Sequence, residues 1–137
     1  MNNSYPTAII TGASRGIGRA LALLLAKHNF QLSLIARNVG ELKDLAAEIT
    51  EMGHRPLYFA GDVSDATFVQ QAVEKTAHTF GKIDYMINNA GVGAFGPPDS
   101  YTEEKWDQVF DTNVKGTFLF SQNVLPHMRS AKKGHII

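Results

Sequence analysis

The stretch Thr11-Gly12-Ala13-Ser14-Arg15-Gly16-Ile17-Gly18 decides the fold predicted for this chain. It follows an apolar run at residues 7–10 and precedes an amphipathic run at residues 19–28. A strand, a glycine-rich turn and a helix in this order place backbone N–H groups at a helix N-terminus, where they bind anions. We interpret Gly12 as the tight turn, Gly16 as the approach to a phosphate and Gly18 as a close packing contact of the helix.

The glycine spacing in this turn is G-x-x-x-G-x-G, not the commoner G-x-G-x-x-G of dinucleotide-binding folds. Alone, it would also fit a purely structural turn. Two further motifs follow it: Asn88-Asn89-Ala90-Gly91, and Asn113 in a predicted helix. The three motifs together resemble the short-chain dehydrogenase/reductase family, and the resemblance runs from Thr7 to Ile137. It implies a Rossmann fold that binds a nicotinamide dinucleotide.

Composition predicts one soluble domain, residues 1–137, which we interpret as the dinucleotide-binding domain. Hydrophobic residues make up 44% of the chain and charged residues 19%, and the net charge is zero. This balance argues against a nucleic-acid partner. No cysteine and five scattered histidines argue against a metal site. No apolar run is long enough for a bilayer, and residues 1–6 lack the pattern of a signal peptide, so we expect no membrane partner and a cytoplasmic protein.

Apolar strands alternate with amphipathic segments along the chain, which predicts βαβ units. The fold class expected is α/β: a Rossmann-like, doubly wound parallel sheet in three layers, with the chain ending after the start of strand five. The strands are expected at residues 7–11, 31–36, 56–60 and 83–87, with a fifth opening at 134–137. Right-handed crossovers and the family resemblance give the strand order 3-2-1-4-5.

Four helices are expected between these strands, each with an apolar stripe at helical spacing. Ser64 or Asp65 is predicted to cap the third, and a capping box at residues 100–103 the fourth, which runs to about Arg129. The stripes are, in order: Ile17, Leu21, Leu24 and Leu25; Leu42, Leu45, Ala46 and Ile49; Phe68, Val69, Ala72, Val73 and Thr76; Trp106, Val109, Phe110, Asn113, Val114 and Thr117.

Arg37 lies directly after the second strand, where a dinucleotide fold contacts the adenosine ribose. An acidic residue there would accept hydrogen bonds from a 2′-hydroxyl and repel a 2′-phosphate. This chain has Arg37-Asn38 and no acid before Glu41. Because Arg15 adds a second guanidinium, NADP(H) is favoured over NAD(H). The alternative is that both arginines are solvated surface charges.

Two further segments follow strands and complete the predicted site. The family resemblance places Asp62 and Val63 beside the adenine, and makes Asn89, Ala90 and Gly91 part of the cofactor lining. Both segments are also compatible with ordinary turns. The predicted cofactor-binding set is Gly12, Ser14, Arg15, Gly16, Ile17, Gly18, Arg37, Asp62, Val63, Asn89, Ala90 and Gly91, with no metal ligand.

Asn113 is the single catalytic residue predicted. It falls on the apolar stripe of the fourth helix, and a buried amide without partners is costly. Bonding to backbone or to a structural water is one explanation. The resemblance implies another, in which the matching asparagine holds a water in a proton relay to a catalytic lysine.

The resemblance implies an oxidoreductase that transfers a hydride to or from a carbonyl or alcohol substrate. The family's substrate-orienting Ser and its Tyr-x-x-x-Lys pair would follow the residues present here. Tyr101 and Lys105 match that spacing but precede Asn113, so we do not assign them this role. The alternative is a non-catalytic NADP-binding module. Related epimerases and redox-sensing regulators fit the asparagine motifs less well. We also expect a homo-oligomer, because the fifth strand leaves an uncovered sheet edge and apolar face.

Overall fold

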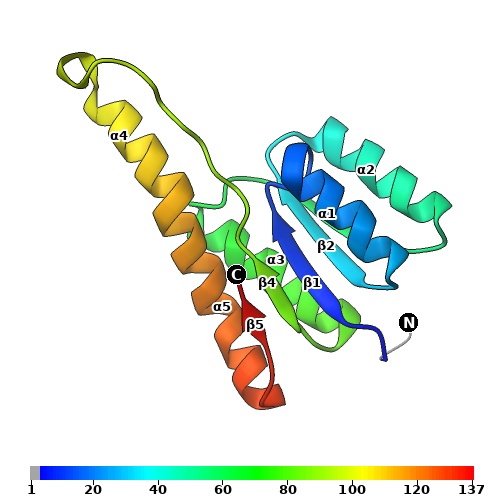
Figure 1. Ribbon diagram of the computed structural model, residues 1–137. Helices are drawn as coiled ribbons and strands as arrows, with labels where there is room; N and C mark the ends of the chain where they lie inside the picture. Colours follow the sequence, from blue (N-terminus) through cyan, green and yellow to red (C-terminus); the bar gives the residue numbers. More distant parts are fainter. Residues whose placement is uncertain (1–3) are drawn as a thin grey trace.

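The protein folds around a five-stranded parallel sheet (Figure 1). The computed structural model describes residues 4–137, so Met1–Asn3 of the segment considered for a signal peptide lie outside the described residues. The strand order is β3-β2-β1-β4-β5, and every neighbouring pair is parallel, which confirms the predicted topology. The strands are β1 (Thr7–Thr11), β2 (Gln31–Ala36), β3 (Leu57–Ala60), β4 (Tyr85–Ile87) and β5 (His135–Ile136).

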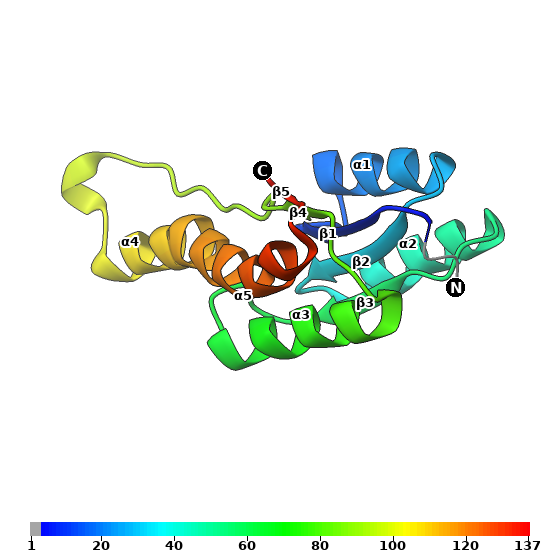
Figure 2. The ribbon, with the colours of Figure 1, turned by 90° about the horizontal axis from the view of Figure 1, so that it is seen from below.

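Helices cover both faces of the sheet and complete the three predicted layers. Ala8 and Ile10 of β1 pack with buried residues of α1 and α2, whereas Ile9 packs with those of α3 and α5. Figure 2 shows α1 on one side of the sheet and α3 and α5 on the other. The helices are α1 (Gly16–Lys27), α2 (Val39–Glu51), α3 (Ala66–Phe80), α4 (Glu103–Phe110) and α5 (Gly116–Ala131), with the short turns η1 (Pro98–Ser100) and η2 (Asp111–Lys115).

Local capping explains where most helices begin and end. Asn38, Asp65 and Thr102 each accept a hydrogen bond from the backbone N–H three residues on, at the start of α2, α3 and α4. Gly81 closes α3 in the left-handed conformation. The capping box predicted from Ser100 is wrong by two residues, because Ser100 lies in η1, where its hydroxyl donates to the Pro97 carbonyl.

The buried face of α1 differs from the predicted one. Ile17 and Leu24 are exposed, and the fully covered residues are Gly18, Ala22 and Ala26. The sequence of α1 is apolar nearly all round, so the spacing of its large side chains does not identify the inner face. The small residues do, because they allow the helix to lie close to the sheet. The stripe predicted for α2 is confirmed, with all four residues buried.

The stripe predicted to be buried on the fourth helical run is mostly exposed. Trp106 and Val114 are 55% and 56% exposed, and Asn113 is exposed as well. The physical reason is that α4 extends away from the sheet (Figure 1), so no other described element covers it. Between Glu103 and Ala131 the run departs from an α-helix at η2, which is π-helical.

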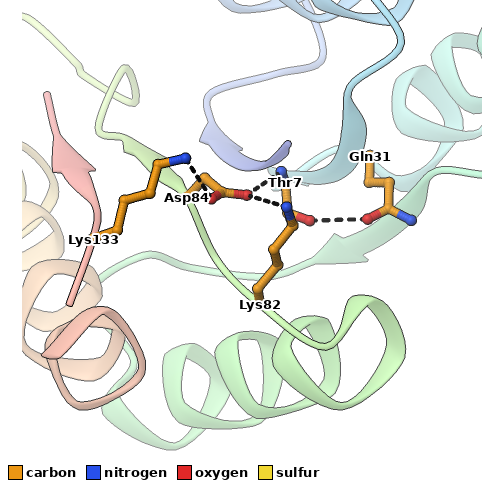
Figure 3. Close-up of polar contacts among 5 residues, drawn as sticks. All are labelled: Thr7, Gln31, Lys82, Asp84 and Lys133. Carbon is orange, nitrogen blue, oxygen red and sulfur yellow. Dashed lines mark hydrogen bonds and ion pairs between the residues drawn. The ribbon is translucent and has the colours of Figure 1, made fainter. Parts of the chain in front are cut away.

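A buried carboxylate joins the strands at the amino end of the sheet (Figure 3). Asp84 accepts a hydrogen bond from the Thr7 backbone N–H at 2.9 Å, and the ammonium groups of Lys82 and Lys133 lie 3.4 and 3.9 Å from its oxygens. Its own backbone donates to the Thr7 carbonyl and accepts from His135 N–H. Asp84 therefore links β1, β4 and β5 through both its side chain and its backbone.

None of the helices found in residues 4–137 is both long and apolar enough to cross a membrane. In the same residues, no three His, Cys, Asp or Glu side chains gather into a group that could hold a metal ion.

Candidate cofactor-binding site

A cleft of about 340 Å³ lies at the carboxyl ends of the strands. Segments that follow β1, β2, β3 and β4 meet there, as expected for the switch point of a doubly wound sheet. The cleft is lined by Gly12, Ser14, Arg15, Ala36, Arg37, Asn38, Glu41, Gly61, Asp62, Val63, Asn89, Ala90, Gly91, Val92 and Thr112. Most of the predicted cofactor-binding residues are thus brought together in one place.

The N-terminus of α1 differs from those of α2, α3 and α4. No side chain caps it, whereas side chains of Asn38, Asp65 and Thr102 cap α2, α3 and α4. The first turn of α1 also contains no acidic residue. Within residues 4–137 its leading N–H groups therefore have no protein partner and are available to an anion beside the cleft.

Four predicted residues do not line the cleft. Gly16 has a positive φ of 58°, and a Cβ built there would meet no atom within 4 Å, so it faces open space. Ile17 is 79% exposed. A Cβ on Gly18 would lie 2.2 Å from the Gly12 carbonyl oxygen and 2.6 Å from Asn89 Nδ2. Gly18 therefore serves the packing of α1 onto the turn. The fourth predicted residue that does not line the cleft is Asn113.

Hydrogen bonds between the ends of β1 and β4 hold the floor of the cleft. The Thr11 hydroxyl oxygen accepts from the backbone N–H groups of Asn89 and Ala90, each at 3.0 Å. The Asn89 side-chain amide donates to the carbonyls of Thr11 and Gly12 at 3.1 and 3.2 Å. The asparagine motif thus fixes the glycine turn against the neighbouring strand.

Arg15 and Arg37 line the cleft, and the charge of Arg37 acts on the carboxylate of Asp62. Across residues 4–137, neither guanidinium forms a hydrogen bond or an ion pair. Guanidinium groups match the geometry of phosphate oxygens, and here both are available for such an anion.

Asp62 lies between these cations and the start of α3. Its Oδ1 accepts from the Ser64 N–H at 2.9 Å and from the Ser64 hydroxyl at 2.8 Å. The backbone hydrogen bond is the main cause that lowers the pKa of Asp62; the Ser64 hydroxyl, Arg37 and Lys115 add to it, while partial burial opposes it. Oδ2 makes no hydrogen bond within the described chain and remains an acceptor at the cleft.

Asn113 has a different geometry from the one predicted. It sits on η2, exposed, and its side chain pairs with the backbone of one residue: Oδ1 accepts from Val92 N–H and Nδ2 donates to the Val92 carbonyl, both at 2.8 Å. The side chain of Asn113 thus bonds to backbone and the expectation of burial is wrong, while its role in a proton relay stays a prediction. Asn113 positions the segment after β4 along the cleft.

Six lining residues were absent from the predicted set: Ala36, Asn38, Glu41, Gly61, Val92 and Thr112. Asn38 and Gly61 stand one or two residues after a strand's carboxyl end, and Glu41 follows in the first turn of α2; these positions were the available signal. Val92 lies in a segment without a periodic pattern, and Thr112 lies on the π-helical turn η2. No signal in the sequence therefore places either residue at the cleft.

Fold and cleft together define a doubly wound dinucleotide-binding protein. A family model described as short chain dehydrogenase matches residues 6–137, and the chain belongs to this family. It is 40% identical over 131 residues to oxidoreductase UcpA of Salmonella typhimurium, covering 96% of this chain and 49% of that protein.

Solved structures agree with this assignment. A 3-ketoacyl-ACP reductase from Sinorhizobium meliloti superposes with a TM-score of 0.91 at 35% identity, over 96% of this chain and 52% of that one. A metagenomic short-chain oxidoreductase in complex with NADP gives 0.90 at 34% identity, over 98% and 61%. The chain spans about half the length of the curated relatives it matches.

Proposed function

We propose that residues 1–137 form the dinucleotide-binding domain of an NADP(H)-dependent oxidoreductase that acts on a carbonyl or hydroxyl group. The observation that carries this proposal is the cleft itself. An uncapped helix N-terminus lies beside it, and the two arginines that line it form no hydrogen bond or ion pair within residues 4–137. The NADP bound by the metagenomic relative supports the choice of cofactor.

Each part of the dinucleotide has a matching group in the cleft. The leading N–H groups of α1 would hold the pyrophosphate, and Arg15 and Arg37 the 2′-phosphate. Asp62 Oδ2 would accept from the adenine amino group. Ala90 and Gly91 leave room for the nicotinamide side, while Asn113 holds Val92 in place through its two hydrogen bonds. The chemistry supplied by the bound nicotinamide is hydride transfer to or from a carbon that carries oxygen.

A fluorescence titration with NADPH and, separately, NADH tests this proposal. Because the two cofactors share the same fluorophore, their curves compare directly. We expect saturable binding with NADPH at least tenfold tighter, the equivalent of one charge-assisted contact to the 2′-phosphate. Equal affinities would contradict the NADP assignment, and no binding to either would contradict the cofactor site.

A pair of glycine variants tests where the cofactor binds. Gly18→Ala places a Cβ 2.2 Å from the Gly12 carbonyl oxygen and should abolish measurable binding. Gly53→Asn is the control, since a Cβ at Gly53 would meet no atom within 4 Å and the positive φ of 91° there is one that asparagine adopts. Asparagine tolerates this conformation, so affinity should stay within twofold.

We also propose that the chain forms a homo-oligomer through the exposed apolar stripe of α4, η2 and α5. Trp106, Phe110, Val114 and Phe118 follow one another at four-residue intervals, and the first two rings stack with centroids 4.3 Å apart. Analytical ultracentrifugation of the wild type and of Phe118→Lys tests this. A wild type that sediments as a monomer at every concentration would contradict it.

A further inference from the structure

Glu41 brings an unpaired negative charge into the cleft that holds the two arginines. It lines the cleft together with Arg15, Arg37 and Asn38. Its backbone is fixed, because Glu41 N–H donates to Asn38 Oδ1 at 3.1 Å in the first turn of α2. Its carboxylate forms no hydrogen bond and no ion pair within residues 4–137.

The missing ion pair matters for the electrostatics of the cleft. A carboxylate paired with Arg37 would cancel the charge of both groups. Unpaired, Glu41 adds a full negative charge beside the two guanidiniums, and a phosphate dianion placed among them is repelled by it. A ribose that carries only hydroxyl groups meets no such repulsion and gains an additional hydrogen-bond acceptor.

We propose that Glu41 sets the cofactor preference of this cleft by opposing the 2′-phosphate that the two arginines attract. This inference rests on the proposed function, because it assumes that the adenosine ribose lies between α2 and the glycine turn. Its consequence is a smaller preference for NADP(H) than the arginines alone would give.

A purely structural role for Glu41 makes a different prediction. Glu41 is the third residue of α2, where a carboxylate stabilises a helix through its interaction with the helix dipole. Replacing it would then change the stability of α2 and the affinity for every nucleotide alike. Only a role at the ribose separates ligands that differ by the 2′-phosphate.

The decisive test is calorimetric titration with 2′,5′-ADP and 5′-AMP, which differ by the 2′-phosphate and need no nicotinamide site. We expect Glu41→Gln to tighten 2′,5′-ADP binding about three- to tenfold, the size of one screened charge–charge interaction, and to change 5′-AMP less than twofold. Glu41→Lys should extend the change in the same direction. The gain should shrink in 0.5 M salt.

Asp44→Asn is the matched control, since Asp44 is an exposed acid of the same helix outside the cleft and its loss changes the net charge equally. It should leave both affinities within 1.5-fold. Equal changes for both nucleotides in Glu41→Gln, or the same gain in Asp44→Asn, would overturn the role of Glu41. If the wild type binds neither nucleotide, the proposed function and this inference both fail. Thermal unfolding monitored by circular dichroism confirms that each variant is folded.

Discussion

Charged side chains have opposite environments at the two ends of the sheet. At the amino end, the carboxylate of Asp84 is buried and contacts the Thr7 N–H and two lysine ammonium groups (Figure 3). At the carboxyl end, Arg15, Arg37 and Glu41 line a cleft, and their charged groups form no hydrogen bond or ion pair within the described chain.

The difference follows from the cost of burying charge. A buried ion without partners destabilises the fold, so a charge inside the protein is satisfied there. An exposed charge has no such requirement and is available to a ligand. Mutations at the amino end should therefore lower the stability of the fold with little effect on cofactor affinity. Mutations around the cleft should lower cofactor affinity with little effect on stability.

The largest effect is expected from Asp84→Ala. The buried Thr7 N–H would lose its acceptor, and β1, β4 and β5 would lose their shared side-chain contact. The free energy of unfolding should fall by about 2–3 kcal/mol. Urea denaturation measures this loss, with Asp99→Ala in the exposed loop as a control that should change it by less than about 0.5 kcal/mol. NADPH affinity of the folded fraction should not change; a large change would break the proposed separation of the two ends.

Thr11→Val tests the contact between the glycine turn and β4. Valine keeps the shape but leaves the Ala90 N–H without an acceptor within the described chain, while the Asn89 N–H keeps only the Ile87 carbonyl at 3.1 Å. We expect a loss of about 2 kcal/mol in unfolding free energy, together with weaker NADPH binding, because the same groups form the floor of the cleft. Thr11→Ser retains the hydroxyl oxygen and should recover most of both. Equal losses in the two variants would assign the effect to packing.

The strands and the topology were predictable because their signals are local. The bounds of β1 and β2 match the prediction, since each is a continuous apolar run ended by turn residues. The buried face of α2 was also predictable, because polar residues cover the rest of that helix. In α1, where nearly every position is apolar, the same method was right only in part: Leu21 and Leu25 pack against the core, whereas Ile17 and Leu24 are exposed.

The site was predictable where it follows strand ends and unpredictable where it depends on distant contacts. Arg37 and Asp62 stand directly after strands, so their position at the cleft followed from the topology. The placement of Asn113 depends on Val92, 21 residues away, and on a π-helical turn that no periodic pattern encodes. Its apolar neighbours indicated burial, yet the rest of the described chain does not cover them.

Arg37→Gln tests the carboxyl end of the sheet alone, because it changes a charge in the cleft and leaves the amino end intact. Because Arg37 forms no hydrogen bond or ion pair within the described chain and acts only on the largely solvated Asp62, its loss should leave stability within about 0.5 kcal/mol of the wild type. NADPH binding should weaken about tenfold, the loss of one charge-assisted contact, while NADH changes less than twofold. Competition titration measures both. Arg55→Gln, an exposed arginine near the start of β3, is the control and should change neither affinity.

The smallest effect concerns Asp62, a carboxylate that the Ser64 backbone holds at the rim of the cleft. Its pKa is lower in the folded state than in the unfolded chain, so the ionised form stabilises the fold. That stabilisation is complete above the unfolded pKa of about 4 and is lost as the pH falls through the lower, folded value. Since Asp62 is largely solvated, Asp62→Asn should cost less than about 1 kcal/mol at pH 7.

Urea unfolding of both proteins at pH 7 and pH 3 measures the predicted window, and the difference between them should narrow at the lower pH. Ser64→Ala removes the hydroxyl donor but keeps the N–H, the larger cause, so it should reduce the pH dependence only in part. A difference that stays constant with pH would mean that the turn prefers aspartate for its shape and not for its charge. The cleft would then hold its carboxylate by geometry alone, unlike Asp84 at the opposite end.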